Sequence, residues 1–415
     1  MANAKDRLKV INRVKALVLR HHFNVGNVDY TAWAREVNQQ APVLTAADDL
    51  TFETGVREVL AQLKSSHTNF FRSTSQPPKP QHAVGATLRS VNHHGATRWM
   101  FLDVYEESPA DLAGIRPGDI LVAIDGNELA PPMEPAFRFG EAHKLSVGSL
   151  SNGGRREVVV SIPARKGSRG RPPLVEPQSV AYRMVKPGVG LLKIPFFSGA
   201  FGIRFSKLVD EAIRALTAQG CDRLIVDLRG CLGGSLGFAH LVSYFSPARV
   251  PIGYDITPNR QRRGYDVRGL PHVPMPANRS GLLWYLLRFS VRDKSLVLLT
   301  QELGAQPFHG RIAVLINEWT NSAGEMAAQF AKDTKLAIVV GCKTMGNVLG
   351  STMFNVGSGY RLYLPIFGWY SPDGTYLEGS GVEPDVPVDI DPDELAYGRD
   401  AQLNRALEVL AGREG

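Results

Sequence analysis

The composition of the sequence is typical of a globular protein and does not favour a nucleic-acid-binding protein. It has 415 residues, of which 44% are hydrophobic and 21% charged, and a net charge of +7. This composition suits two to three domains with sizeable cores. The basic residues are spread along the chain apart from a cluster at 259–269, where we expect a solvated loop and not a nucleic-acid site.

Cysteine usage and the N-terminus bear on compartment and cofactors. Cys221, Cys231 and Cys342 have no metal-ligand spacing, and their odd number does not suggest a disulfide framework. We therefore expect no metal and no organic cofactor. Charges interrupt the apolar positions of the first 23 residues, and no stretch is long enough to span a bilayer. We expect a cytoplasmic protein without a membrane span.

The first predicted elements are helices. Apolar residues recur at helical spacing in 7–23 and again in 53–66. The Pro-rich stretch 73–81 then breaks the pattern and is typical of a linker. The sequence predicts a helical N-terminal region over residues 1–75.

The following segments are predicted to form two further domains. Residues 76–168 hold short β-like runs separated by Gly, Pro and Asn turns. After a second Pro-rich loop, residues 177–395 alternate between strand and helix patterns, which indicates an α/β sheet covered by helices. Residues 396–415 are expected to form a C-terminal helix.

Within the α/β segment, the stretch "INEWTNSAGEMAAQF" (316–330) reads as a strand end, a turn and a helix. Ser322 followed by Glu325 fits a capping box, which satisfies free amides of the first helical turn. A hydroxyl at a sharp strand-to-helix turn is also what a serine hydrolase requires of its nucleophile. The stretch alone leaves both interpretations open.

The β-rich domain carries "SPADLAGIRPGDILVAIDGNEL" (108–129), which resembles the most regular part of a PDZ domain. PDZ domains add an extended peptide as a strand and hold its terminal carboxylate with backbone amides. By this resemblance Val84, Gly85 and Ala86 would form the peptide-binding loop. The implied partners are protein or peptide substrates with free, apolar C-termini.

Three further segments, "VDLRGCLGGSLGFAHLV", "INEWTNSAGEMAAQFAKD" and "GTYLEGSGVEPDVPV", resemble the C-terminal processing peptidases, or tail-specific proteases, and their tricorn-core relatives. The likeness runs from about residue 30 to 395 and implies a ClpP/crotonase-like α/β core with serine endopeptidase activity. Ser322 would be the nucleophile. The backbone amides of Gly233 and Ala323 would form the oxyanion hole.

The general base differs from that of many tail-specific proteases. Where they place a lysine, this chain has Asn347, and Lys343 is expected to be a solvated loop lysine. The branch with a Ser-His-acid triad takes its histidine from an N-terminal segment, which here matches His67 in "LKSSHTNFF". Ser65 stands there in place of the usual Asp, and Cys231 stands where the family has Asn. With His67 as the base, activity should rise as the imidazole loses its proton near neutral pH.

The acidic triad member is chosen among Glu378, Glu383 and Asp385. Glu378 matches the acid position of the triad branch best. The other two lie in a turn before the last strand, where such residues usually cap or fix a loop.

Two questions stay open at the level of sequence. The insertion at about 249–310 contains an apolar run at 280–290, which could be a buried helix, a lid over the substrate or the face of a homo-oligomer. The rival function is a non-catalytic protein that binds ligands or peptides on the same scaffold, because a fold does not settle a function.

Overall fold

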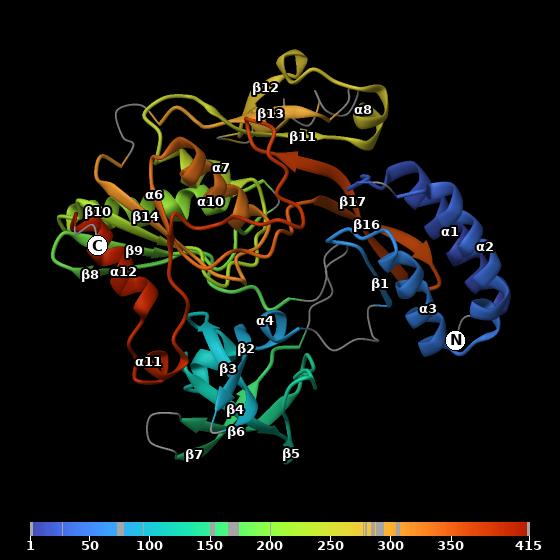
Figure 1. The fold of residues 1–415 in the computed structure, drawn as a ribbon, viewed down its shortest axis with the longest axis horizontal. Coiled ribbons are helices and arrows are strands. Elements are labelled where there is room, and N and C mark those ends of the chain that lie inside the picture. The colour runs from blue at the N-terminus through green and yellow to red at the C-terminus, as the bar shows by residue number, and fades with distance from the viewer. Residues whose placement is uncertain are drawn as a thin grey trace.

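The structure is a computed structural model that describes residues 3–26, 28–72, 79–93, 95–149, 154–164, 174–199, 201–276, 278, 280–283, 287, 294–303 and 308–412. Its elements form an α/β core, a second sheet covered by the N-terminal helices, and a separate β-rich domain (Figure 1).

The core sheet has six strands in the order β18-β15-β14-β10-β9-β8. The strands from β18 to β9 pair in parallel, and β8 pairs antiparallel with β9 at the edge. Parallel pairing explains the strand and helix alternation in the sequence, because each parallel crossover needs a connecting segment. The strands are β8 (Ala181–Lys186), β9 (Val189–Lys193), β10 (Arg223–Asp227), β14 (Arg311–Ile316), β15 (Ile338–Gly341) and β18 (Val386–Pro387).

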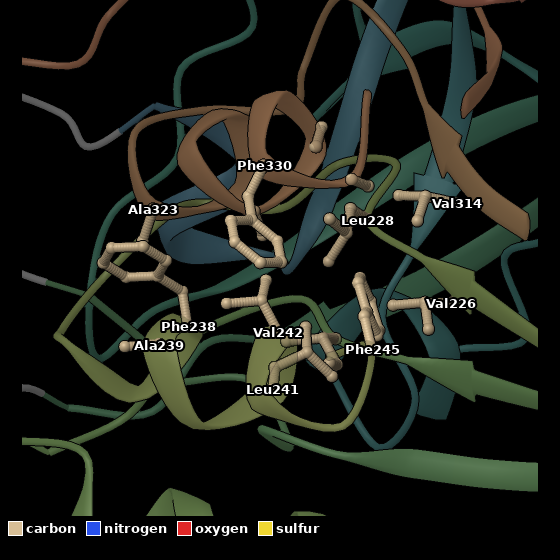
Figure 2. Packing of buried hydrophobic residues seen from close by; sticks show 14 of the residues in the cluster. Val226, Leu228, Phe238, Ala239, Leu241, Val242, Phe245, Val314, Ala323 and Phe330 are labelled. Carbon is tan, nitrogen blue, oxygen red and sulfur yellow. The ribbon is translucent and has the colours of Figure 1, made fainter. Parts of the chain in front are cut away.

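Both faces of this sheet are buried, so side chains alternate between two apolar clusters. Val226 on β10 belongs to the cluster beneath α6 (Ile203–Ala218), α7 (Gly237–Ser243) and α10 (Ala323–Thr334), whereas Ile225 belongs to the cluster beneath α12 (Ala401–Leu410). Figure 2 shows α7 and α10 presenting apolar side chains to each other, with Phe330 of α10 directed at α7. This packing fixes the start of α10 relative to the loop before α7.

A second sheet joins the N-terminus to the C-terminal half. Its strands run β1-β17-β11-β13-β12, and β16 pairs with β17. Strand β1 pairs antiparallel with β17, with Phe70 opposite Leu362. The region 1–75 is therefore not only helical, because it ends in a strand of a sheet built mostly from residues beyond 250. The strands are β1 (Asn69–Arg72), β11 (Pro251–Ile256), β12 (His272–Pro274), β13 (Leu296–Leu299), β16 (Gly350–Gly357) and β17 (Tyr360–Tyr370).

Three N-terminal helices cover this second sheet (Figure 1, blue). Their apolar faces share one buried cluster with β1, β16 and β17, which includes Phe52, Phe70 and Tyr360. The helices are α1 (Ala4–His21), α2 (Tyr30–Ala46) and α3 (Asp49–Ala61), with Asp29 and Asp48 capping the starts of α2 and α3. Within the described residues, no helix is both long and apolar enough to cross a membrane.

The β-rich domain is a sheet in the order β2-β3-β4-β6-β7, with the short β5 against β4. It encloses its own core around Phe101, Phe137 and Leu145. Its elements are α4 (Pro80–Ala83), β2 (Ala86–His93), β3 (Ala96–Val104), α5 (Pro109–Leu112), β4 (Asp119–Ile124), β5 (Asn127–Glu128), β6 (Ala142–Ser149) and β7 (Arg155–Ser161).

The β-rich domain touches the core close to the loop before α7. Tyr105 Oη donates to the Gly230 carbonyl at 2.8 Å, and Asn317 Nδ2 donates to Asp103 Oδ2 at 3.0 Å. At the rim, Arg89 pairs with Asp389 at 2.9 Å. The end of β3 is thus bonded to the turns on either side of the candidate site.

The insertion 249–310 supplies β11, β12 and β13 to the second sheet, together with α8 (Pro258–Arg263). In its apolar run, Leu283 and Leu287 are 59% and 62% exposed, which does not favour a buried helix at these two positions. Trp284, Tyr285 and Leu286 lie outside the described residues. At the C-terminus, α11 (Pro392–Ala396) precedes the expected helix α12.

Candidate active site

Ser322 lies at the turn between β14 and α10, half-buried, with φ 52° and ψ −115°. A helix N-cap normally has extended backbone, and a positive φ is unusual for a residue with a Cβ. Strained backbone of this kind is characteristic of functional sites and of the sharp turn that presents a hydrolase nucleophile. Capping alone does not require this conformation.

Glu325 organises the turn around Ser322. This fully buried carboxylate accepts from the Ser322 amide at 3.0 Å, which is the carboxylate half of the predicted capping box. It also accepts from Thr344 Oγ1 and from the amides of Gly346 and Asn347, at 2.6 to 2.8 Å. Burial raises the pKa of Glu325, and the four hydrogen bonds oppose that shift. Glu325 therefore ties the start of α10 to a second loop.

The predicted oxyanion residues lie against the nucleophile. A Cβ added to Gly233 would be 2.7 Å from the Ser322 Cβ and 3.4 Å from the Ala323 nitrogen, so the Gly233 backbone directly abuts the start of α10. Gly233 also has φ +80°, which a side chain would strain. The close approach of these two backbone segments requires a glycine at residue 233.

Cys231, the residue that departs from the family pattern, is completely buried in the same loop. Its carbonyl accepts from the Asn321 amide at 2.9 Å, so a backbone bond links this loop to the turn before Ser322. Burial raises the pKa of the Cys231 thiol to about 12, and the thiol stays protonated and unreactive. With Cys at this position in place of the family's Asn, the loop is still bonded to the turn before Ser322.

His67 lies in the turn between α3 and β1, at φ 56°. Its Nδ1 is 2.8 Å from Ser66 Oγ, and its ring is tilted against Tyr363 with centroids 6.0 Å apart. Burial lowers the pKa of His67 to about 4, so the imidazole is neutral at pH 7. Its Nε2 makes no hydrogen bond to any described residue.

Glu378 lies beside the His67 turn without bonding the imidazole directly. Its Oε1 accepts from the Ser66 amide at 2.8 Å, and its Oε2 accepts from the Val348 amide at 2.9 Å. Glu383 instead pairs with Lys343 at 2.7 Å, and Asp385 accepts from the Val339 amide at 2.9 Å. Of the three acids, Glu378 is the one that contacts the histidine segment.

One loop joins the two halves of the site. The amide of Asn347 is held by Glu325 from the nucleophile side, and the next amide, that of Val348, is held by Glu378 from the histidine side. Asn347, at the position where many tail-specific proteases have lysine, therefore has a structural role here, because its backbone amide bonds Glu325. Lys343, with its side chain 53% exposed and bound to Glu383, is the loop lysine that the sequence predicts.

The loop predicted to bind a peptide carboxylate is occupied by its own bonds. The amides of Val84 and Gly85 donate to the Pro80 carbonyl at 2.9 and 3.3 Å, and the Val84 and Ala86 side chains are buried. Gly85 has φ +71° and a Cβ there would be 2.4 Å from the Ser108 Cβ. A peptide carboxylate could use these two amides only if they turned away from Pro80.

Sequence reasoning missed how two residues, Ser66 and Glu325, contribute to the candidate site. Ser66 stands between Glu378 and His67, and its position next to the histidine was the only signal. Glu325 was predicted as a cap, but its bonds to the 344–347 loop join segments that the sequence does not relate. Among the described residues, no group of His, Cys, Asp and Glu side chains could hold a metal ion.

Comparison with known proteins finds two family models that match parts of the chain. Residues 188–388 match the model of peptidase family S41, and residues 100–136 match a PDZ domain. Residues 188–388 are thus similar to the peptidase domain of family S41. This match confirms the resemblance drawn from the sequence and, with the mixed sheets and helices, the expected fold class.

Curated relatives include CtpA-like serine proteases of staphylococci. The Staphylococcus aureus protein is 24% identical over 310 residues, covering 74% of this chain and 52% of the relative. The Staphylococcus epidermidis protein is 23% identical over 288 residues, covering 68% and 49%. The chain thus spans about half the length of the curated relatives that it matches.

Solved structures share the S41 fold along nearly the whole chain. A photosystem II D1 C-terminal processing protease matches with a TM-score of 0.54 and 17% identity, covering 92% of this chain and 93% of that one. An S41 protease from Bacteroides fragilis matches with a TM-score of 0.60 and 15% identity, covering 97% of each. Mature CPAF complexed with lactacystin matches with a TM-score of 0.57 and 15% identity, covering 98% of each.

Proposed function

We propose that this S41 chain is a serine endopeptidase that cleaves polypeptides through an acyl-enzyme on Ser322, with His67 as the base. One observation carries the proposal. Two successive amides, of Asn347 and Val348, are held by carboxylates that hold the Ser322 turn and the His67 turn respectively. The same loop is therefore bonded to the turn of the strained Ser322 and to the turn of the neutral His67.

The proton path depends on the tautomer of His67. If Nδ1–H of His67 donates to Ser66 Oγ, then Nε2 has the lone pair that accepts the Ser322 proton. The Ser66 amide donates to Glu378, so the carboxylate acts on the imidazole through Ser66. Glu378 is therefore a positioning residue that also favours positive charge on His67 as it forms.

The remaining steps use the backbone. Ser322 Oγ attacks the scissile carbonyl, and the amides of Gly233 and Ala323 receive the developing oxyanion. His67 then donates its proton to the leaving amine as the C–N bond breaks, which leaves an acyl-enzyme. Water loses a proton to His67 as it attacks the acyl-enzyme. His67 then returns this proton to Ser322 Oγ as the ester C–O bond breaks and the carboxylic acid product departs.

The PDZ-like domain supports a preference for polypeptide substrates. PDZ domains bind chain ends, and Tyr105, directly after β3 of this one, donates to the Gly230 carbonyl in the loop before α7. We infer that the domain captures free, apolar C-termini and that the protein acts in the cytoplasm. Both statements rest on the sequence, and homo-oligomer formation stays a prediction.

The decisive experiment is covalent labelling with a fluorophosphonate together with peptide hydrolysis. We expect the probe to label Ser322, and we expect Ser322→Ala and His67→Ala each to lose most hydrolysis, by about 10²-fold or more. Lys343→Ala is the matched control, because Glu383 is the one partner that its ammonium has among the described residues, and both side chains lie at the surface. A folded protein that is neither labelled nor hydrolytic would instead favour the binding-protein alternative.

A further inference from the structure

A chain of four polar side chains lies behind the His67 turn. His22, directly after α1, is 2% exposed. Its Nδ1 is 2.8 Å from Tyr30 Oη, and its Nε2 is 2.9 Å from Ser65 Oγ. Ser65 Oγ is in turn 2.7 Å from Thr68 Oγ1. This series of hydrogen bonds therefore links the ends of α1 and α2 to the turn that contains His67, the proposed base.

We propose that His22 is a positioning residue for the reaction, whose Nε2 fixes the turn 64–68 so that His67 faces Ser322; this inference rests on the proposed function. Ser65, which receives the bond, stands where the sequence resemblance expects an Asp. The imidazole of His22, directly after α1, then constrains the turn at the position where a carboxylate is missing.

The turn needs such a constraint because its backbone is strained. Lys64 and His67 have φ of 48° and 56°, and both carry side chains. Conformations of this kind persist only where the surroundings over-determine them. The Ser65 and Thr68 hydroxyls bridge the turn, and the buried His22 anchors that bridge to α1 and α2. Without the anchor, the turn can relax toward ordinary backbone angles and carry His67 away from Ser322.

The protonation state of His22 is consistent with this role. Burial lowers the pKa of His22 to about 4, so the ring is neutral at pH 7, with one N–H and one lone pair. Tyr30 Oη can donate to Nδ1, Nε2–H can donate to Ser65 Oγ, and Ser65 can donate to Thr68. With the other tautomer every donor also has an acceptor. Nδ1–H then donates to Tyr30 Oη, Ser65 donates to Nε2, and Tyr30 Oη donates to the His22 carbonyl at 3.3 Å. No member of the chain needs to be charged.

Two substitutions separate positioning from stability. In His22→Gln the side-chain amide reaches about as far as Nε2 and can keep the bond to Ser65. In His22→Asn the amide reaches only as far as Nδ1 and can keep the bond to Tyr30. Each variant retains one of the two hydrogen bonds, so the two should lose similar stability, but only His22→Asn releases the His67 turn.

The measurement is the rate at which a fluorophosphonate phosphonylates Ser322, with fluoride as the leaving group, resolved into kinact and KI. We expect His22→Asn to lower kinact by about 10-fold or more, with KI changed by less than about 2-fold, since small misplacements of a catalytic group are costly. His22→Gln should stay within about 3-fold of wild type in kinact. Melting temperatures are measured in parallel, with His143→Asn as a control for loss of a buried histidine in the PDZ-like domain.

A further variant covers the case in which His22→Asn does not fold. Ser65→Ala removes the receiving hydroxyl without touching the buried ring and should lower kinact as His22→Asn does. Combining the two should give no additional loss, because both remove one constraint. Equal kinact in both His22 variants, or in Ser65→Ala and wild type, would overturn the inference while leaving Ser322 catalysis intact. If the folded wild type itself resisted both labelling and peptide hydrolysis, the proposed function would be the part that fails.

Discussion

At the scale of single residues, the environment of His67 determines the pH range of the proposed enzyme. Burial lowers the pKa of its imidazole from 6.5 to about 4. Catalysis requires the neutral form, so activity should be present above this pKa and be lost as the pH falls through it. The sequence-based expectation of a rise near neutral pH took no account of burial.

We therefore expect the acid limb of kcat/KM to have its midpoint near pH 4 and not near 6.5, because kcat/KM reports ionisations of the free enzyme. The profile is measured between about pH 3.5 and 8 at constant ionic strength, with circular dichroism at each pH to confirm that the chain is folded. A midpoint at the ordinary histidine value would show that His67 is solvated in the working enzyme.

Residue types and order were readable from the sequence, but contacts were not. Ser322, His67 and Glu378 were found by motif, and the structure places Glu378 beside the His67 segment through Ser66. Nothing in the spacing of residues revealed that Glu325 holds the loop at 346–347, since that bond depends on how two helix-flanking loops meet. Their catalytic roles stay predictions.

At the scale of elements, Ser322 is both the N-cap of helix α10 and the proposed nucleophile. The two roles are separable by substitution. Asp would be a poor replacement for the cap, because the buried Glu325 carboxylate already bonds the Ser322 amide and would repel a second carboxylate. Asn keeps a capping oxygen without charge and tolerates positive φ better than most residues.

We expect Ser322→Asn to retain more stability than Ser322→Ala, by up to about 0.5–2 kcal/mol, and to be inactive like it. Urea unfolding gives the stability difference, and peptide hydrolysis gives the activity. Hydrolysis by the Asn variant at the wild-type rate would mean that Ser322 is a cap only.

The PDZ-like domain yields a second prediction at this scale. In a full-length Ser322→Ala protein, a peptide with a free apolar C-terminus should bind about 10-fold or more tightly than its C-terminal amide, because only the acid can be captured by backbone amides. Isothermal titration gives both affinities. Gly85→Ala should weaken the acid peptide selectively, since its Cβ would be 2.4 Å from the Ser108 Cβ. Equal affinities for acid and amide would exclude carboxylate capture.

Most elements followed from local patterns, whereas their partners did not. Alternation of strands and helices predicted the core sheet, and helical spacing predicted α1 and α3. Strand β1 was not anticipated, because its four residues gain their partner from β17, nearly three hundred residues later in the chain. Short edge strands are specified by tertiary pairing more than by their own composition.

At the scale of the whole molecule, histidines that are buried or partly buried make the free energy of unfolding depend on pH. Burial lowers the pKa of His22, His67 and His82 to about 4. Between about pH 6.5 and 4 the unfolded chain binds these protons and the folded chain does not. The free energy of unfolding is therefore highest above the histidine pKa of the unfolded chain, and it falls as the pH is lowered through this interval.

We expect the urea midpoint to fall steadily from pH 7 to pH 4.5, with unchanged activity per folded molecule over most of that range. His22→Gln removes one of the titrating groups and should flatten the decline, which provides the control. A midpoint that did not change across the interval would indicate that these imidazoles ionise freely in the folded state.

The pairing of β1 with β17 also governs when the protein can act during its own synthesis. His67 emerges early from the ribosome, but the strand that holds its turn in place spans Tyr360–Tyr370, and Glu378 follows later still. A nascent chain that already contains Ser322 still lacks both. The proposed protease is thereby inert toward neighbouring polypeptides, and toward itself, until the segment through Glu378 has been synthesised.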